Sequence, residues 1–245
     1  ARPVPGGEIL KERLGDLNAV LAAKERGELK VKGKKIVIMG HSLGALTALF
    51  AAGAVPEEGL KNRCERALND LSLTNLSKLL QCQLIDMNFE KQTQNAQIEA
   101  IIAINSFGSL LWPEASDASI PFPVFLIGGT FDLITPAISE QLGLLLSLKA
   151  NQYHRALIVQ GASHFSPVRV EGQLNQEKGG DLFQLGESLV GLKPVLVQDT
   201  LASEIIKYLN KLESGVAIPS SIHKKNSDIR FHILDRSNVQ RLLGS

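Results

Sequence analysis

The chain has 245 residues, which suits one large α/β domain or two small ones with a sizeable buried core. Its net charge of +1 excludes the strong field with which many proteins bind nucleic acid or a membrane surface. No apolar run reaches the roughly 20 residues of a membrane-spanning helix. The first predicted element is an amphipathic helix over residues 8–27, because Leu10, Leu14, Leu17 and Leu21 recur at helical spacing.

Four short apolar runs are predicted to be strands of a mainly parallel sheet. They are "KIVIMG" (35–40), "EAIIAIN" (99–105), "PVFLIGG" (123–129) and "RALIVQG" (155–161). Continuous apolar runs rich in β-branched residues are typical of strands that are covered on both faces. Helices are predicted at residues 43–54, 137–148 and 199–212. This alternation favours an α/β fold with right-handed βαβ crossovers.

Two regions interrupt the alternation. Residues 55–97 carry helical patterns among many polar residues and are predicted to form a helical cap insertion over the carboxyl edge of the sheet. Residues 214–245 are polar and basic, and we expect a solvated tail with one short strand or helix rather than a binding module. The core of the domain then comprises residues 1–54 and 98–213.

The segment "GHSLG" (40–44) has the strand–turn–helix context of a nucleophile elbow. In such an elbow the serine adopts a strained backbone conformation that projects its hydroxyl from the sheet. Glycine is expected at Gly40 and Gly44 because side chains there would collide with the turn or the neighbouring strand. We therefore predict that Ser42 is a nucleophile rather than a serine of an ordinary tight turn. The backbone N–H of Leu43, at the start of the next helix, is predicted to donate to an oxyanion.

A serine nucleophile needs a base, and a histidine base needs a carboxylate to fix its tautomer. Asp132 lies just after the strand 123–129, and His164 lies just after the strand 155–161. The order serine, acid, histidine along the chain accompanies this type of elbow. The alternative roles are a helix cap for Asp132 and a backbone contact for His164. Their positions at successive strand ends favour a triad of Ser42, His164 and Asp132.

The other titratable residues suit a catalytic role less well. His41 is expected to point away from Ser42, and His154 precedes its strand. The remaining candidates lie before a strand or in the tail: Glu114, Asp117, His223 and His232. The five histidines show none of the spacings typical of metal sites, so we predict neither a metal nor a cofactor.

Cys64 and Cys82 flank the helical part of the insertion. Two buried thiols and a disulfide are both open at this point. A disulfide would stabilise the cap by about 3 kcal/mol in the chain-entropy model. It would also imply a periplasmic or secreted protein, whereas free thiols would imply a cytoplasmic one.

Six segments resemble the α/β-hydrolase superfamily, and within it the cyanobacterial-type predicted dienelactone hydrolases, which are related to platelet-activating-factor acetylhydrolases. They are "RLGDLNAVLAA", "KIVIMGHSLGALTAL", "LSKLLQCQL", "AIIAINSFGSLLWP", "VFLIGGTFDLITP" and "IVQGASHFSP", which span most of residues 8–167. The resemblance implies that Ser42, Asp132 and His164 hydrolyse a carboxylic ester through an acyl-enzyme, without a cofactor. The dienelactone name marks kinship only, since true dienelactone hydrolases usually use a cysteine where this chain has Ser42.

The sequence departs from this family on the N-terminal side of the elbow. Family members have several strands there, and one of the loops between them supplies a second oxyanion N–H. Residues 1–41 show only one helix and one strand. We therefore expect the strand 35–40 to be an exposed apolar edge that pairs with a second chain or a missing N-terminal segment. Loss of one oxyanion donor can cost about 3 kcal/mol of transition-state stabilisation.

Several side chains are candidates for a substrate pocket, although core packing is equally open for them. The candidates are His41, Phe107, Leu111, Trp112 and Phe165. The sequence thus predicts a serine carboxylic-ester hydrolase for small to medium apolar esters. The alternatives are a lipid acyl hydrolase or acyltransferase of the same fold, and a non-catalytic hydrolase-fold interaction module. The expected partner is a small-molecule ester, with no nucleic acid.

Overall fold

The structure, a computed structural model, describes residues 6–69, 76–88, 97–113, 118, 120–168, 192, 194–226 and 229–244. Its centre is one mixed sheet of six strands in the order β1-β2-β3-β4-β6-β5. The strands are β1 (Ile36–His41), β2 (Ile98–Ile104), β3 (Val124–Gly129), β4 (Arg155–Val159), β5 (Ser221–Asn226) and β6 (Ile229–Leu234). The first four are parallel to one another, so the predicted mainly parallel α/β sheet is confirmed.

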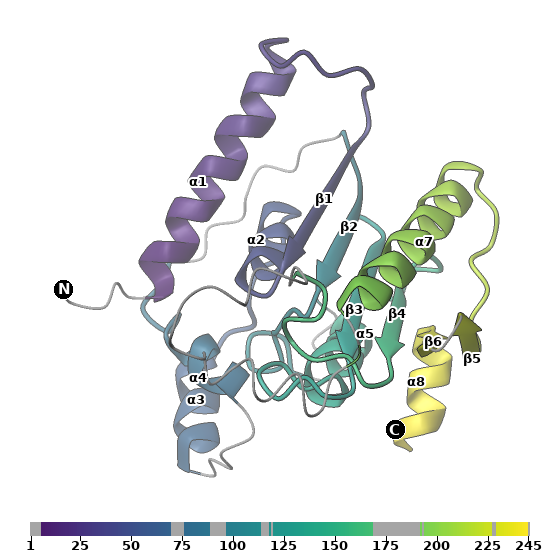
Figure 1. Cartoon of the computed structure of the whole chain (residues 1–245). Coiled ribbons are helices and arrows are strands. Elements are labelled where there is room, and N and C mark those ends of the chain that lie inside the picture. The colour runs from purple at the N-terminus through teal and green to yellow at the C-terminus, as the bar shows by residue number, and fades with distance from the viewer. Residues whose placement is uncertain are drawn as a thin grey trace, which may run out of the picture.

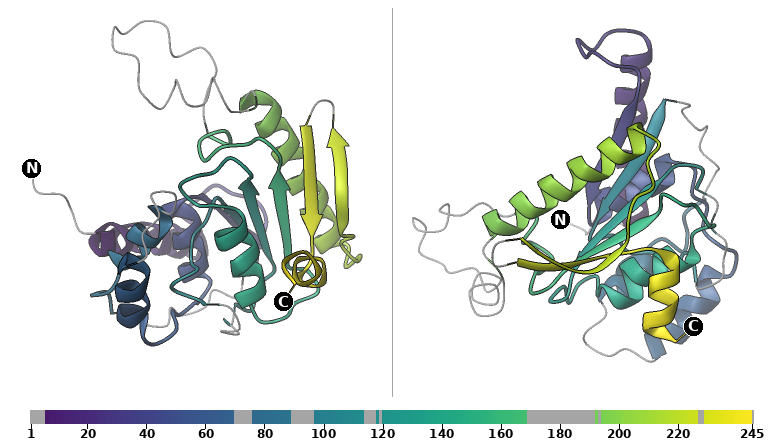
Figure 2. Two further views of the ribbon diagram at one scale, coloured as in Figure 1. Left: turned by 90° about the horizontal axis from the view of Figure 1, so that it is seen from below. Right: turned by 90° about the vertical axis from the view of Figure 1, so that its right-hand side faces the viewer.

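Helices cover both faces of this sheet (Figures 1 and 2). One face carries α1 (Gly6–Glu25), α2 (Leu43–Ala51), α5 (Gly143–Ser147) and α8 (Arg236–Leu243). The other face is covered by α7 (Pro194–Glu213). The predicted helix 137–148 begins as a π-helical turn, η1 (Ile138–Leu142), which continues directly into α5.

Alternating residues of the central strands build the two cores. Ile101 of β2 and Ile158 of β4 join the core under α2 and α5. Their neighbours Ile102 and Leu157 point to the opposite side and pack with α7. Because both faces are covered, every residue of β3 and β4 is buried, as the continuous apolar runs predict. Because β1 to β4 are parallel, their carboxyl ends lie at one edge of the sheet.

The C-terminal residues differ from the solvated tail that we predicted. β6 pairs antiparallel with β4, and β5 pairs antiparallel with β6. Ile229, Phe231 and Ile233 alternate along β6 and are buried against α7. Arg230 and His232 stand between them. The prediction of a solvated tail is wrong because the overall polarity of the segment hid this two-residue period of a half-buried strand.

β1 lies at the edge of the sheet. Among the described strands it pairs only with β2, so its other side has no strand neighbour in that part of the chain. Two of its apolar side chains are exposed, Val37 by 40% and Met39 by 62%. The structure therefore has the exposed apolar edge that we expected, and its pairing with a further strand stays a prediction.

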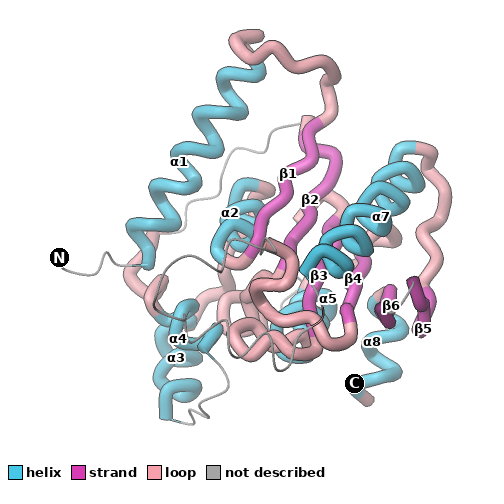
Figure 3. Tube along the Cα trace, in the orientation of Figure 1, coloured by secondary structure: helices cyan, strands magenta, loops and turns pink. Residues whose placement is uncertain are grey.

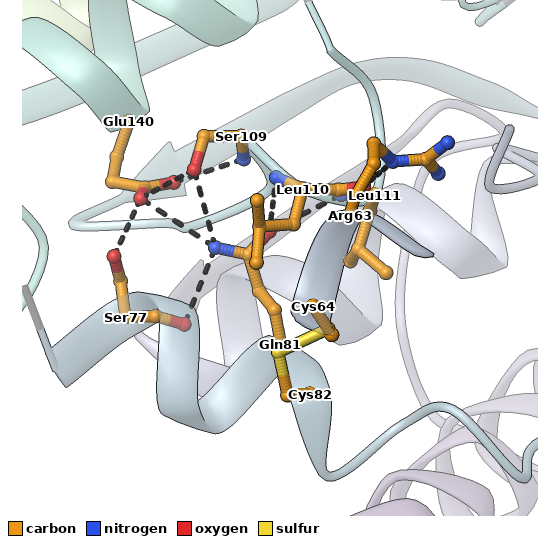
Figure 4. Close-up of a disulfide and its surroundings, with 9 residues drawn as sticks. All are labelled: Arg63, Cys64, Ser77, Gln81, Cys82, Ser109, Leu110, Leu111 and Glu140. Carbon is orange, nitrogen blue, oxygen red and sulfur yellow. Dashed lines mark hydrogen bonds between the residues drawn. A yellow bond between two sulfur atoms is a disulfide. The ribbon is translucent and has the colours of Figure 1, made fainter. Parts of the chain in front are cut away.

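The described part of the insertion contains two helices, α3 (Leu60–Asn69) and α4 (Leu76–Cys82). They lie beyond the carboxyl ends of β1 and β2 (Figure 1). A disulfide between Cys64 and Cys82 joins them (Figure 4). Of the two states that the sequence left open, the structure contains the disulfide, which is the form favoured in an oxidising compartment.

His154 is a buried histidine just before β4. Its Nδ1 accepts a hydrogen bond from the backbone N–H of Val124 at 3.0 Å. Burial lowers the pKa of His154 from 6.5 to about 4. The nearby cations Arg155 and Arg236 lower this pKa further, whereas the backbone of Lys149 raises it. The folded protein thus strongly favours the neutral imidazole.

We expect His154 to make the free energy of unfolding fall as the pH drops from about 6.5 to about 4. Over that window the unfolded chain binds the proton and the folded chain does not, so stability present above pH 6.5 is progressively lost, by about 3 kcal/mol in total. Urea unfolding across this range should show a smaller fall for His154→Gln, since glutamine still offers Val124 an acceptor and does not titrate. Identical pH dependence in the two proteins would contradict the expectation.

Candidate active site

Ser42, Asp132 and His164 all follow parallel strands at one edge of the sheet. Ser42 comes directly after β1, whereas Asp132 and His164 lie in the loops after β3 and β4. These loops are part of the pink segments in Figure 3. Open α/β sheets bind ligands at this edge, because the loops that leave the carboxyl ends of their strands converge there.

Ser42 has the strained backbone that the predicted elbow requires. Its φ is 54° and its ψ is −120°, an arrangement that a residue with a side chain rarely adopts. The conformation is held by a hydrogen bond from the Ser42 N–H to the carbonyl oxygen of Ile104 at 2.8 Å. The Ser42 hydroxyl makes no capping hydrogen bond to α2. A helix-capping role therefore does not account for serine at this position.

Two glycines allow the backbone segments of the site to approach one another. A Cβ at Gly40 would lie 2.2 Å from the carbonyl oxygen of Gly44, so the predicted need for glycine at residue 40 is confirmed. A Cβ at Gly44 would meet no atom within 4 Å, so the collision predicted there is wrong. A Cβ at Gly129 would lie 2.1 Å from the carbonyl oxygen of Ala162. Only glycine at residue 129 lets the loops after β3 and β4 pack directly together.

Asp132 and His164 form a direct hydrogen bond in the interior. Oδ2 of Asp132 lies 2.8 Å from Nδ1 of His164, and the two residues are 2% and 5% exposed. The other carboxylate oxygen, Oδ1, accepts the backbone N–H groups of Ile134 and Thr135 at 2.9 and 2.7 Å. Asp132 therefore both shapes its own loop and binds the histidine. A carboxylate at Nδ1 places the imidazole proton there and leaves Nε2 as the basic nitrogen.

Ser42 is connected to this pair through its neighbour His41. The rings of His41 and His164 have centroids 4.8 Å apart, and Nε2 of His41 donates to the carbonyl oxygen of His164 at 2.7 Å. Among the hydrogen bonds of the described residues, none joins the Ser42 hydroxyl to Nε2 of His164. In enzymes, hydrogen bonds between catalytic groups are often long without substrate and shorten when it binds.

Asn105 and Thr135 belong to the same cluster and are not among the predicted site residues. Asn105 directly follows β2, and its side-chain amide donates to the carbonyl oxygen of His164 at 2.8 Å. The hydroxyl of Thr135 donates to Oδ2 of Asp132 at 2.7 Å and lies 3.2 Å from the carbonyl oxygen of Asn105. The one sequence signal for Asn105 is a polar residue directly after a buried strand, at the edge where the site forms.

Four of the five predicted pocket residues, all except His41, divide into two groups. Phe107, Leu111 and Trp112 are buried in the core, and the indole N–H of Trp112 donates to the backbone carbonyl of Val55 at 2.8 Å. Their positions favour core packing, and a part in substrate binding stays a prediction. Phe165 is half-buried, and its ring meets that of His164 edge to face, with centroids 5.3 Å apart. It lies beside the candidate base.

Comparison with known proteins does not assign this chain to a family. No protein-family model matches the chain, and no curated protein matches it either. Within the described ranges, no group of three histidine, cysteine, aspartate or glutamate residues is placed to hold a metal ion. In the same ranges, no helix is both long and apolar enough to span a membrane.

Proposed function

We propose that the protein is a serine carboxylic-ester hydrolase with an α/β-hydrolase fold. The observation that supports this most directly is the buried hydrogen bond between Asp132 and His164, at the sheet edge where Ser42 has its strained backbone. Burying a carboxylate beside an imidazole is costly unless both groups are hydrogen-bonded, and buried titratable pairs of this kind are concentrated at functional sites. The pairing sets the imidazole tautomer that a serine hydrolase needs.

In the proposed reaction, Nε2 of His164 accepts the proton of the Ser42 hydroxyl as its oxygen attacks the ester carbonyl carbon. The N–H of Leu43, the first residue of α2, donates to the oxyanion. His164 then gives the proton to the departing alcohol, which leaves Ser42 acylated. A water molecule deprotonated by His164 attacks the acyl-enzyme, so that the carboxylic acid is released and Ser42 is restored. Asp132 stabilises the imidazolium in both steps.

We expect a fluorophosphonate probe to modify the folded protein at one residue, Ser42. Such probes require a serine activated by a neighbouring base, so labelling reports the chemistry without knowledge of the natural ester. Peptide mass spectrometry should place the adduct on Ser42, and Ser42→Ala should remove it. Ser214→Ala, at an exposed position after α7, is the matched control and should label as the wild type does. Folded protein that stays unmodified would overturn the proposal.

Small to medium apolar esters are the proposed substrates. A lipid acyl hydrolase or acyltransferase would use the same three residues, and product analysis with an added alcohol separates transfer to the alcohol from transfer to water. The exposed edge of β1 favours one further candidate, a non-catalytic interaction module. For that module we expect no probe labelling in protein whose fold is verified by circular dichroism.

A further inference from the structure

The backbone carbonyl oxygen of His164 accepts two hydrogen bonds from side chains. Nε2 of His41 lies 2.7 Å away and Nδ2 of Asn105 lies 2.8 Å away. His164 itself belongs to no helix or strand, whereas His41 ends β1 and Asn105 directly follows β2. The loop that carries the candidate base is thus attached at this residue to the ends of two strands.

His41 is suited to donate this hydrogen bond as a neutral ring. Burial lowers the pKa of His41, and the hydrogen bond to the carbonyl of His164 partly opposes that shift. A positive charge on His164 would lower the pKa of His41 further, and the negative charge of Asp132 raises it. At neutral pH the ring is therefore uncharged, with its single proton on Nε2, the atom that donates to the carbonyl. The proton-bearing nitrogen of His41 is engaged by this carbonyl oxygen.

Asn105 combines a special backbone conformation with a buried amide. Its φ is 48°, a left-handed value that asparagine tolerates better than most residues with a side chain. Its backbone N–H donates to the carbonyl oxygen of Ile127 at 2.7 Å, which fixes the residue between the ends of β2 and β3. Glycine would adopt this backbone with less strain but has no amide to donate. The conformation and the side chain together aim the amide at His164.

We infer that His41 and Asn105 are positioning residues that hold the His164 carbonyl and thereby align its imidazole between Asp132 and Ser42. The inference rests on the proposed function. It assigns His41 a role in orienting the base instead of the predicted role in the substrate pocket. We call the two hydrogen bonds from His41 and Asn105 to this carbonyl the clamp. Because geometric errors of about 1 Å at a reacting group can lower rates about 100-fold, the clamp affects turnover more than substrate affinity.

The test compares Asn105→Gly, which keeps the backbone conformation and removes the amide, with His41→Leu and His41→Gln. We expect Asn105→Gly and His41→Leu to lower kcat and the rate of fluorophosphonate labelling by about 10- to 100-fold, with KM within about twofold of the wild type. His41→Gln retains an N–H donor and should recover part of the rate. Proton NMR gives a readout independent of activity, because the downfield signal of the proton between Asp132 and His164 should broaden or shift in the two impaired variants.

His154→Gln is the matched control, since it replaces a histidine outside the cluster and should label at the wild-type rate at neutral pH. If wild-type Ser42 labels and Asn105→Gly labels equally fast with an unchanged NMR signal, the inference is wrong and the proposed function stands. If wild-type Ser42 does not label, the proposed function fails. The NMR signal then still decides whether the clamp exists, and an unchanged signal in both impaired variants would overturn it.

Discussion

Asp132→Asn is expected to lower kcat by about 10⁴-fold while the protein stays folded. Asparagine keeps an oxygen for the backbone N–H groups of Ile134 and Thr135, so the loop after β3 retains its hydrogen bonds. The new amide would face Nδ1 of His164, where the carboxylate oxygen now lies at 2.8 Å. An amide donor at Nδ1 moves the imidazole proton to Nε2, which then cannot accept the proton of Ser42.

Hydrolysis of a p-nitrophenyl ester measures this effect, and KM should change little because Asp132 is buried away from solvent. Asp16→Asn, at an exposed position of α1, is the control for loss of a carboxylate and should keep wild-type turnover. Thermal unfolding of Asp132→Asn should stay cooperative. A kcat within about tenfold of the wild type would show that this carboxylate does not set the tautomer of His164.

The sheet and the Asp132–His164 pair are predictable from the sequence because each depends on local patterns. β2, β3 and β4 are short apolar runs, and Asp132 and His164 are polar residues that follow two of them. Parallel strands bring such residues to one edge whatever the details of packing. The distance in sequence between these segments therefore does not hinder the prediction.

The clamp on His164 and the C-terminal hairpin are not predictable in the same way. The contacts of Asn105 and His41 with the carbonyl oxygen of His164 depend on how the ends of β1 and β2 and the loop after β4 are placed in space, which no spacing along the chain encodes. In β6, the basic residues between Ile229, Phe231 and Ile233 lower the mean hydropathy and mask the alternation. The contacts of His164 were missed because they depend on long-range geometry. Strand β6 was missed because its charged residues hide the apolar alternation.

Glu140 is the second carboxylate with a large expected effect. It lies on η1, is fully buried, and accepts hydrogen bonds from four other residues. Figure 4 shows the bonds from Ser77, Gln81 and Ser109. Its Oε2 accepts the backbone N–H groups of Gly108 and Ser109 at 2.8 and 3.0 Å. Its Oε1 accepts the hydroxyls of Ser77, on α4, and of Ser109 at 2.5 and 2.8 Å. One side chain thus joins α4 of the cap, the segment after β2 and η1.

Glu140→Ala is expected to lower the free energy of unfolding by about 3–5 kcal/mol, because several buried donors lose their acceptor at once. Glu140→Gln should cost less, since it keeps one oxygen, but its amide would confront N–H and O–H donors. Glu204→Ala is the matched control, because Glu204 is also buried but pairs with Lys207 and Lys224, whose ammonium groups can return to water. That variant should lose only about 1 kcal/mol in urea unfolding. Equal losses for Glu140→Ala and Glu204→Ala would mean that the donors around Glu140 find other partners, and that this carboxylate does not fasten the cap to the sheet.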